Sequence, residues 1–169
     1  MLKRILLALD SSDSGQVAVS FTIALAGRAT EIRVLHINGF QVGGRGLTLE
    51  TPAEAGALLD DALLQLRSSG MRATGTVVAA TCFSVAEYIV AEAGRWSADA
   101  IVLGSARRRG LRRITCQGVR ERVVRSSCLP VLTAPAPLRV ADADLARAQA
   151  AGAGRRGPHA LPPIRRLHH

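Results

Sequence analysis

The chain has 169 residues, is 48% hydrophobic and carries a net charge of +9, nearly all of it from arginine because Lys3 is its only lysine. This length fits one domain, and three Phe, one Tyr and one Trp exclude the aromatic platform on which single-stranded nucleic acids stack. Three cysteines without a CxxC pair argue against a disulfide framework and a zinc site, and no apolar run is long enough for a membrane span or a signal peptide. We therefore expect a cytoplasmic protein with no metal site.

Apolar runs and amphipathic runs alternate along the chain. Continuous apolar stretches predict buried strands at residues 4–10, 31–37, 72–80, 99–105 and 129–134. Helical periodicity predicts helices at residues 11–29, 52–70, 84–96 and near 117–127, and a glycine-rich stretch predicts a loop over 38–51. This strict alternation predicts an α/β fold: a doubly wound, five-stranded parallel sheet with helices on both faces and right-handed crossovers.

The ends of two helices are marked by local chemistry. Thr51 can cap the second helix, Pro52 suits its first turn and Gly70 suits its end. We expect Gly27 to end the first helix. One face of that helix is expected to point inward, and it carries Val17, Phe21, Ala24 and Leu25.

Two strand ends are the places where a ligand is expected. Doubly wound sheets bind ligands beyond the carboxyl ends of their strands, where the strand order reverses. Here these are the ends of the first and fourth strands. The candidate residues there are Ala8, Asp10, Ser11, Gly104 and Ser105. Asp10 can contact a ribose or can cap the first helix, and the sequence leaves both roles open.

Three segments together resemble the universal stress protein family. These are ILLALDSSDSGQVAVSFTIALA at the start, ADAIVLGSARRRGLRR near the fourth strand and GVRERVVRSSCLPVLTA at the end, within residues 2–134. The resemblance implies a strand that ends in Asp10-Ser11-Ser12 and a fourth strand that runs from Asp99 into Gly104-Ser105. It also implies a regulatory, stress-response role rather than catalysis, with ATP or a related adenine nucleotide, and magnesium, as the ligand of the nucleotide-binding members.

The phosphate loop of those members departs from its pattern here. The pattern is glycine, two residues, glycine, nine residues, glycine and then serine or threonine, which lets backbone amides reach phosphate oxygens. Gly104 fills the first position, but Arg107 fills the second, Gln117 the third and Gly118 the hydroxyl position. Gly110 corresponds to a further glycine that is common in the family. If the pattern is shifted by one residue along the sequence, Gly118 fills the third glycine position but Val119 fills the hydroxyl position. The motif is incomplete in either register.

The arginines of this loop have three competing interpretations. They stand at positions 107, 108, 109, 112 and 113, followed by 120, 122 and 125. First, guanidinium groups can replace amides as phosphate ligands, which weakens nucleotide binding without abolishing it. Second, the site is inactive toward ATP and the domain acts through protein contacts. Third, the arginines and the basic C-terminal segment bind a polyanion, which the lack of aromatics and of a nucleic-acid motif disfavours. A solvated loop that pairs with acids elsewhere is the plain structural alternative.

The resemblance also implies a homodimer. In the family the fifth strand pairs across a two-fold axis, and here that segment is Pro130, Val131, Leu132, Thr133 and Ala134. His36 is expected to be a hydrogen-bonded histidine of the core or of a sheet edge rather than a catalyst, and no general base or nucleophile is visible. The predicted domains are residues 1–134 and a basic, largely disordered segment over 135–169, with no nucleic-acid or membrane partner expected.

Overall fold

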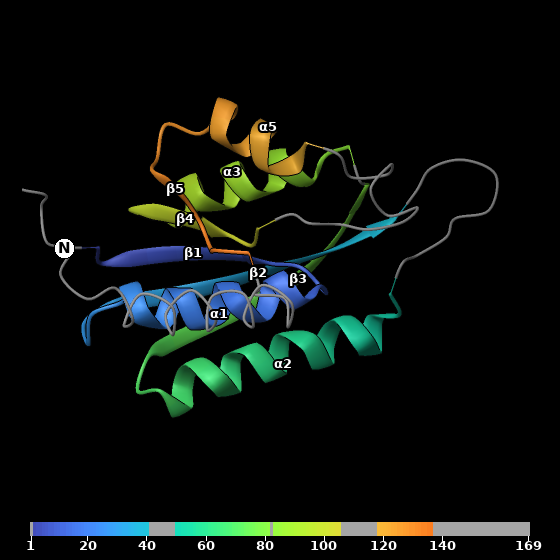
Figure 1. Cartoon of the computed structure of the whole chain (residues 1–169). Coiled ribbons are helices and arrows are strands. Elements are labelled where there is room, and N and C mark those ends of the chain that lie inside the picture. The colour runs from blue at the N-terminus through green and yellow to red at the C-terminus, as the bar shows by residue number, and fades with distance from the viewer. Residues whose placement is uncertain (1, 41–49, 82, 106–117, 137–169) are drawn as a thin grey trace, which may run out of the picture. The chain divides into compact units, whose positions relative to one another are not determined.

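A five-stranded parallel sheet organises the computed structural model, which describes residues 2–40, 50–81, 83–105 and 118–136 (Figure 1). The strands are β1 (Arg4–Leu9), β2 (Glu31–Phe40), β3 (Arg72–Thr81), β4 (Ala100–Leu103) and β5 (Val131–Thr133). The helices are α1 (Asp13–Leu25), α2 (Pro52–Ser68), α3 (Val85–Arg95) and α5 (Val119–Ser126). The strand order is β3-β2-β1-β4-β5, and every pairing is parallel. The doubly wound fold that the sequence predicted is confirmed.

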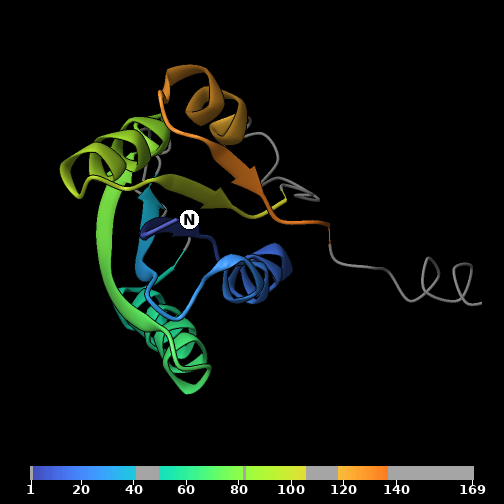
Figure 2. The same ribbon diagram turned by 90° about the vertical axis from the view of Figure 1, so that its left-hand side faces the viewer.

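Each face of the sheet has its own hydrophobic core. Helices α1 and α2 cover one face of the sheet, and α3 and α5 cover the other (Figure 2). Ile5 and Leu7 of β1 belong to the core under α1 and α2, while Leu6 belongs to the core under α3 and α5. Successive side chains of a strand alternate between faces, and both faces of β1 are covered, so the strand is apolar from Ile5 to Leu9. This explains the unbroken run ILLAL.

Local chemistry fixes the ends of α2 as expected. The Thr51 hydroxyl accepts a hydrogen bond from the Glu54 amide at 3.2 Å, and the Glu54 carboxylate accepts one from the Thr51 amide at 2.7 Å. This reciprocal capping box, followed by Pro52, satisfies amides that the first helical turn leaves unpaired. Gly70 follows the helix with a φ of +80°, a left-handed conformation that favours glycine.

The inward face predicted for α1 is partly wrong. Val17 and Phe21 pack against the core, but Ala24 and Leu25 are exposed. The residues of α1 buried on the sheet side include Ala18, Val19 and Thr22. The helix is apolar on nearly every side, so its sequence defines no single stripe, and the buried Thr22 hydroxyl donates back to Ala18 O at 2.7 Å.

The second strand extends further than predicted. Residues 38–40 belong to β2 rather than to the loop, because the whole strand pairs with β3 from Glu31↔Arg72 to Phe40↔Thr81. The rest of that loop, residues 41–49, lies outside the described residues, as does nearly all of the C-terminal segment. Within the described part of the chain, no helix is long and apolar enough to cross a membrane.

Candidate functional site

The carboxyl edge of the sheet has its switch point between β1 and β4, as the sequence predicted. β1 pairs with β2 on one side and with β4 on the other, so the chain leaves β1 and β4 toward opposite faces. Ala8 lies in register with Leu35 and Leu103 and packs on the α3 side. Its side chain thus belongs to the core, and only its backbone lies near the candidate site.

The turn from β1 into α1 is built around Asp10. Asp10 Oδ1 accepts hydrogen bonds from the Ser12 amide at 3.1 Å and from the Ser12 hydroxyl at 2.5 Å. Ser12 is the N-cap of α1, and its Oγ lies 2.5 Å from the buried Ser14 Oγ. Ser12 is thus the N-cap residue of the helix, and the Asp10 carboxylate orients it. Ser11 is exposed at the tip of this turn.

Two glycines let the backbone of this turn lie directly against the strand ends. A Cβ on Gly15 would be 2.2 Å from Asp10 O, which no real structure tolerates without movement. A Cβ on Gly104 would lie 3.0 Å from Ser14 O and 3.2 Å from Ser14 Oγ. The end of β4 and the first turn of α1 are therefore in backbone contact at the switch point, and Gly104 is needed there for close approach.

The hydroxyl next to Gly104 already has a structural partner. Ser105 is buried, and its Oγ donates to Pro135 O at 3.1 Å, while the Ala134 amide donates to Leu103 O at 2.8 Å. These bonds tie the end of β4 to the chain that follows β5. The predicted site residues Arg107 and Gly110 lie outside the described residues.

An acidic side chain, Glu121, lies in the first turn of α5. Gly118 is the N-cap with a φ of +85° and supplies no side-chain cap, and Val119 begins the helix. The backbone amide of Glu121 and then the Arg120 guanidinium stabilise the Glu121 carboxylate and lower its pKa. Where the nucleotide-binding pattern has a serine hydroxyl, this chain thus has glycine, with an acidic side chain one turn further on.

A polar cluster at the end of β2 was missed by the sequence reasoning. His36 is buried, with Nδ1 3.0 Å from Leu9 O and Nε2 2.7 Å from Glu50 Oε2. Since Leu9 O can only accept, Nδ1 carries a proton and donates. Of the two structural roles that were expected for His36, core or sheet edge, its burial supports the core. Asn38 Nδ2 donates to Glu50 O at 3.1 Å.

Asn38 also presents a buried acceptor that finds no donor in the described part of the chain. The residue is 8% exposed, and its Oδ1 is the buried side-chain atom without a hydrogen-bond partner among the described residues. His36 is in register with Leu9, the last residue of β1, so Asn38 lies beyond the end of β1 at the edge where Asp10 stands. A buried acceptor of this kind costs free energy unless something donates to it. Its only sequence signal was a polar residue next to a glycine after a strand.

The predicted dimer segment is a sheet edge. β5 pairs with β4 through Ile101↔Val131 to Leu103↔Thr133, and it is the last strand of the described sheet. Val131 and Leu132 are half-buried, Pro130 and Thr133 are exposed, and Ala134 is buried. Among the described residues no group of three His, Cys, Asp or Glu is placed to hold a metal ion.

Comparison with known proteins agrees with this geometry. A model of the universal stress protein family matches residues 1–135. A member of that family from Burkholderia pseudomallei superposes with a TM-score of 0.61 at 24% identity, over 79% of this chain and 96% of its own. A universal stress protein from Archaeoglobus fulgidus, solved in complex with dAMP, gives 0.59 at 25% identity, over 79% and 98%.

A further solved structure, a universal stress protein in complex with cAMP, gives a TM-score of 0.58 at 18% identity, over 78% of this chain and 95% of its own. A comparison with the curated proteins gives no match. The family match spans every strand and helix described above, and it confirms the resemblance drawn from the strand ends. This chain belongs to the universal stress protein family.

Proposed function

We propose that this chain is a regulatory member of its family that binds an adenine nucleotide at the switch point between β1 and β4, with a weakened hold on the phosphates. The observation that carries the proposal is the buried Oδ1 of Asn38, which finds no donor among the described residues. The exocyclic amine of adenine is a donor that would satisfy it. The dAMP and cAMP complexes of two related structures support the choice of an adenine nucleotide.

The residues present fit the nucleoside better than the phosphates. Asp10 is held in a fixed turn at the same edge, and Gly104 leaves room for a close backbone approach. At the start of α5, Gly118 offers no hydroxyl, and the Glu121 carboxylate would repel a phosphate there. Phosphate recognition then falls to the arginines of residues 107–113, which bind through charge-assisted hydrogen bonds that salt weakens.

A thermal-shift titration with AMP, IMP and ATP, each with and without magnesium, tests this proposal. A ligand that binds only the folded state stabilises it by about 2.7 kcal/mol at roughly a hundred times its Kd. We expect AMP to raise the melting temperature and IMP to act about tenfold more weakly, because IMP has a carbonyl acceptor where adenine has its amine. We expect the difference between the melting temperatures with ATP and with AMP to become smaller as the salt concentration rises.

Variants locate the binding. Asp10→Asn retains Oδ1 as an acceptor for Ser12 and removes the charge, so we expect it to fold and to lose most of the AMP response. Asp60→Asn on the exposed side of α2 is the matched control and should respond as the parent does. No shift with any nucleotide, together with no nucleotide extracted from the purified protein, would refute the proposal.

We also propose that the role is regulatory rather than catalytic. Both ring nitrogens of His36 are engaged, and Asp10 holds the helix cap, so neither is placed as an idle general base. Slow ATP hydrolysis that persists in the Asp10→Asn variant would be incidental to the function. A turnover of about 1 per second or faster that this variant abolishes would contradict the regulatory role.

Homodimerisation through β5 is a second proposal, favoured by the half-buried apolar Val131 and Leu132 at a sheet edge. Sedimentation velocity over a roughly hundredfold concentration range should show a dimer that dissociates on dilution. Thr133→Pro, at an exposed position of the edge, should favour the monomer. A monomer at every concentration would exclude the dimer.

A further inference from the structure

The opposite edge of the sheet is formed by β3, a long strand that carries no charge after its first residue. β3 has ten residues, and its register with β2 extends over all of them. Among the described residues no strand pairs with its outer side. From Ala73 to Thr81 the strand reads ATGTVVAAT, without a charge or a proline. Natural proteins usually shield such an edge with charges, prolines, bulges or a covering element, because it can pair with another chain.

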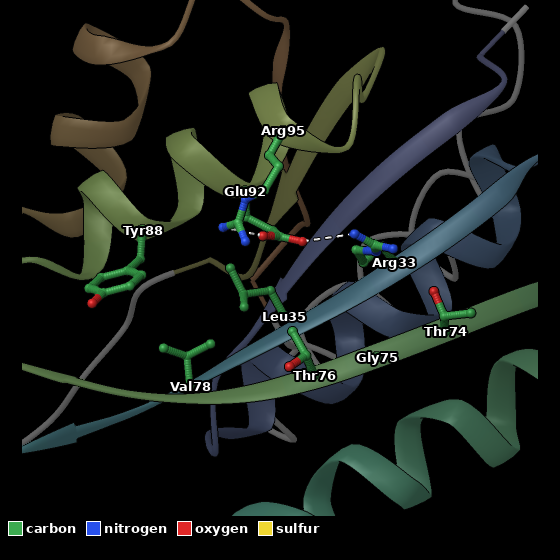
Figure 3. Close-up of a pocket in the computed structure, with 9 residues that line it drawn as sticks. All are labelled: Arg33, Leu35, Thr74, Gly75, Thr76, Val78, Tyr88, Glu92 and Arg95. Atoms are coloured by element: carbon green, nitrogen blue, oxygen red, sulfur yellow. Dashed lines mark hydrogen bonds and ion pairs between the residues drawn. The ribbon is translucent and has the colours of Figure 1, made fainter.

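A groove lies beside this edge on the α3 side of the sheet. It has a volume of about 370 Å³. Figure 3 shows Thr74, Thr76 and Val78 along β3, Arg33 and Leu35 on β2, and Tyr88, Glu92 and Arg95 above them on α3. Its floor is apolar, its β3 wall carries hydroxyl groups and its α3 wall carries charge.

The charges of the groove are fixed in place. Glu92 is only 7% exposed, and its two carboxylate oxygens accept from Arg33 Nη1 at 2.9 Å and from Arg95 Nη2 at 2.6 Å. The Arg33 guanidinium also stacks 5.0 Å from the centre of the Trp96 ring. The Arg95 side chain is 71% exposed. Two guanidinium groups thus face one carboxylate, which leaves the groove with a net positive charge.

We propose that the β3 edge and this groove form a docking site for an extended, acidic segment of a partner protein. The segment adds to the sheet as a sixth strand next to β3, and the main chain of β3 supplies its hydrogen bonds. Its side chains alternate between the two faces, so every second one points to the face of Arg33 and Arg95. Acidic side chains at those positions complement the two guanidinium groups.

Other occupants fit this surface less well. The chain's own segment 138–169 carries six arginines and two aspartates, so its charge has the wrong sign. A second copy that paired through the same strand would bring Arg72 and no acid. Neither brings a net negative charge to Arg33 and Arg95. The proposal does not depend on nucleotide binding, because β3 and β1 are separated in the sheet by β2.

Fluorescence anisotropy on the full chain tests the docking site with a defined probe. The probe is a fluorescein-labelled octapeptide in which glutamate alternates with valine. We expect saturable binding with a Kd below about 1 mM, and binding at least about tenfold weaker for the peptide with lysine in place of glutamate. The glutamate peptide with alternate backbone N-methyl groups should also lose about tenfold, because it cannot complete the added strand.

Variants then separate the groove from general charge attraction. Arg95→Gln should weaken binding of the probe peptide about fivefold. Arg125→Gln on α5 removes the same charge at an exposed site away from β3, and it should leave binding of the probe unchanged. No saturable binding, equal binding of the N-methylated peptide or equal effects of the two variants would overturn the proposal. Self-association of the protein alone that Thr76→Lys abolishes would assign the edge to a second copy and would also overturn it.

Discussion

Replacing Gly15 by alanine tests whether the β1–α1 turn is as tightly closed as the structure has it. Alanine normally stabilises a helix relative to glycine by about 1 kcal/mol. At Gly15, however, the new Cβ would lie 2.2 Å from Asp10 O and 3.2 Å from Leu9 Cδ1. Ordinary contact begins at 3.4 Å, so the helix start must move away from the strand end by about 1 Å.

The size of the effect follows from these opposed terms. Forcing an additional carbon into a packed site costs about 1–3 kcal/mol, and here the neighbour is backbone, which cannot rotate away. We therefore expect Gly15→Ala to lower the free energy of unfolding by about 2 kcal/mol and the melting temperature by roughly 4–8 °C. The shift should also disturb Asp10 and reduce the response to AMP.

Gly56 in α2 is the matched control, because a Cβ there meets nothing within 4 Å. Gly56→Ala should raise the free energy of unfolding by about 0.5–1 kcal/mol. Urea denaturation of the two variants beside the parent measures both changes. A Gly15→Ala protein as stable as the parent would show that the turn has free space, and it would remove the steric reason for glycine at this position.

Further predictions concern helix ends and acid. Thr51→Ala should destabilise the protein by about 1 kcal/mol through loss of the capping box, and Thr51→Ser should retain most of it. Gly118→Ala should cost roughly 1 kcal/mol because of its left-handed φ, as urea denaturation would reveal. Hydrogen bonds from Thr51 lower the pKa of Glu54, and the amides of Arg4 and Lys3 lower that of Asp99. Because their folded-state pKa values lie below the ordinary 4.5 and 3.8, both carboxylates stabilise the fold above those values and lose this contribution as the pH falls further. The urea concentration at the midpoint of unfolding should therefore decrease as the pH is lowered from 5 to 3. An increase over this range would contradict the assignment.

Features decided by near neighbours in the sequence could be predicted. The strand-helix alternation set the sheet type, and Thr51 and Pro52 set the start of α2, because a cap needs only residues within one turn. The switch point followed from the parallel topology alone. The expectation that Asp10 and Gly104 lie together at the carboxyl edge of the sheet is therefore correct.

Features decided by distant contacts could not be predicted. The exposure of Leu25 depends on which side of an almost uniformly apolar helix meets the sheet. The extension of β2 through Asn38 depends on the length of β3, which lies much further along the chain. The hydrogen bond that Ser105, a candidate ligand residue, donates to Pro135 O exists only once β5 is in place.

The position of Trp96 provides an intrinsic fluorescence signal for changes at one end of the sheet. It is the single tryptophan, it follows α3, and guanidinium carbons of Arg4 and Arg33 lie 5.7 and 5.0 Å from its ring centre. Arg4 begins β1 and donates to Trp96 O, so the ring sits at the amino edge of the sheet, opposite the Asp10 turn. Its emission should therefore change on global unfolding and when the β3 groove is filled, yet stay constant as nucleotide binds. One intrinsic signal can thus distinguish the two ends of the same sheet without a label.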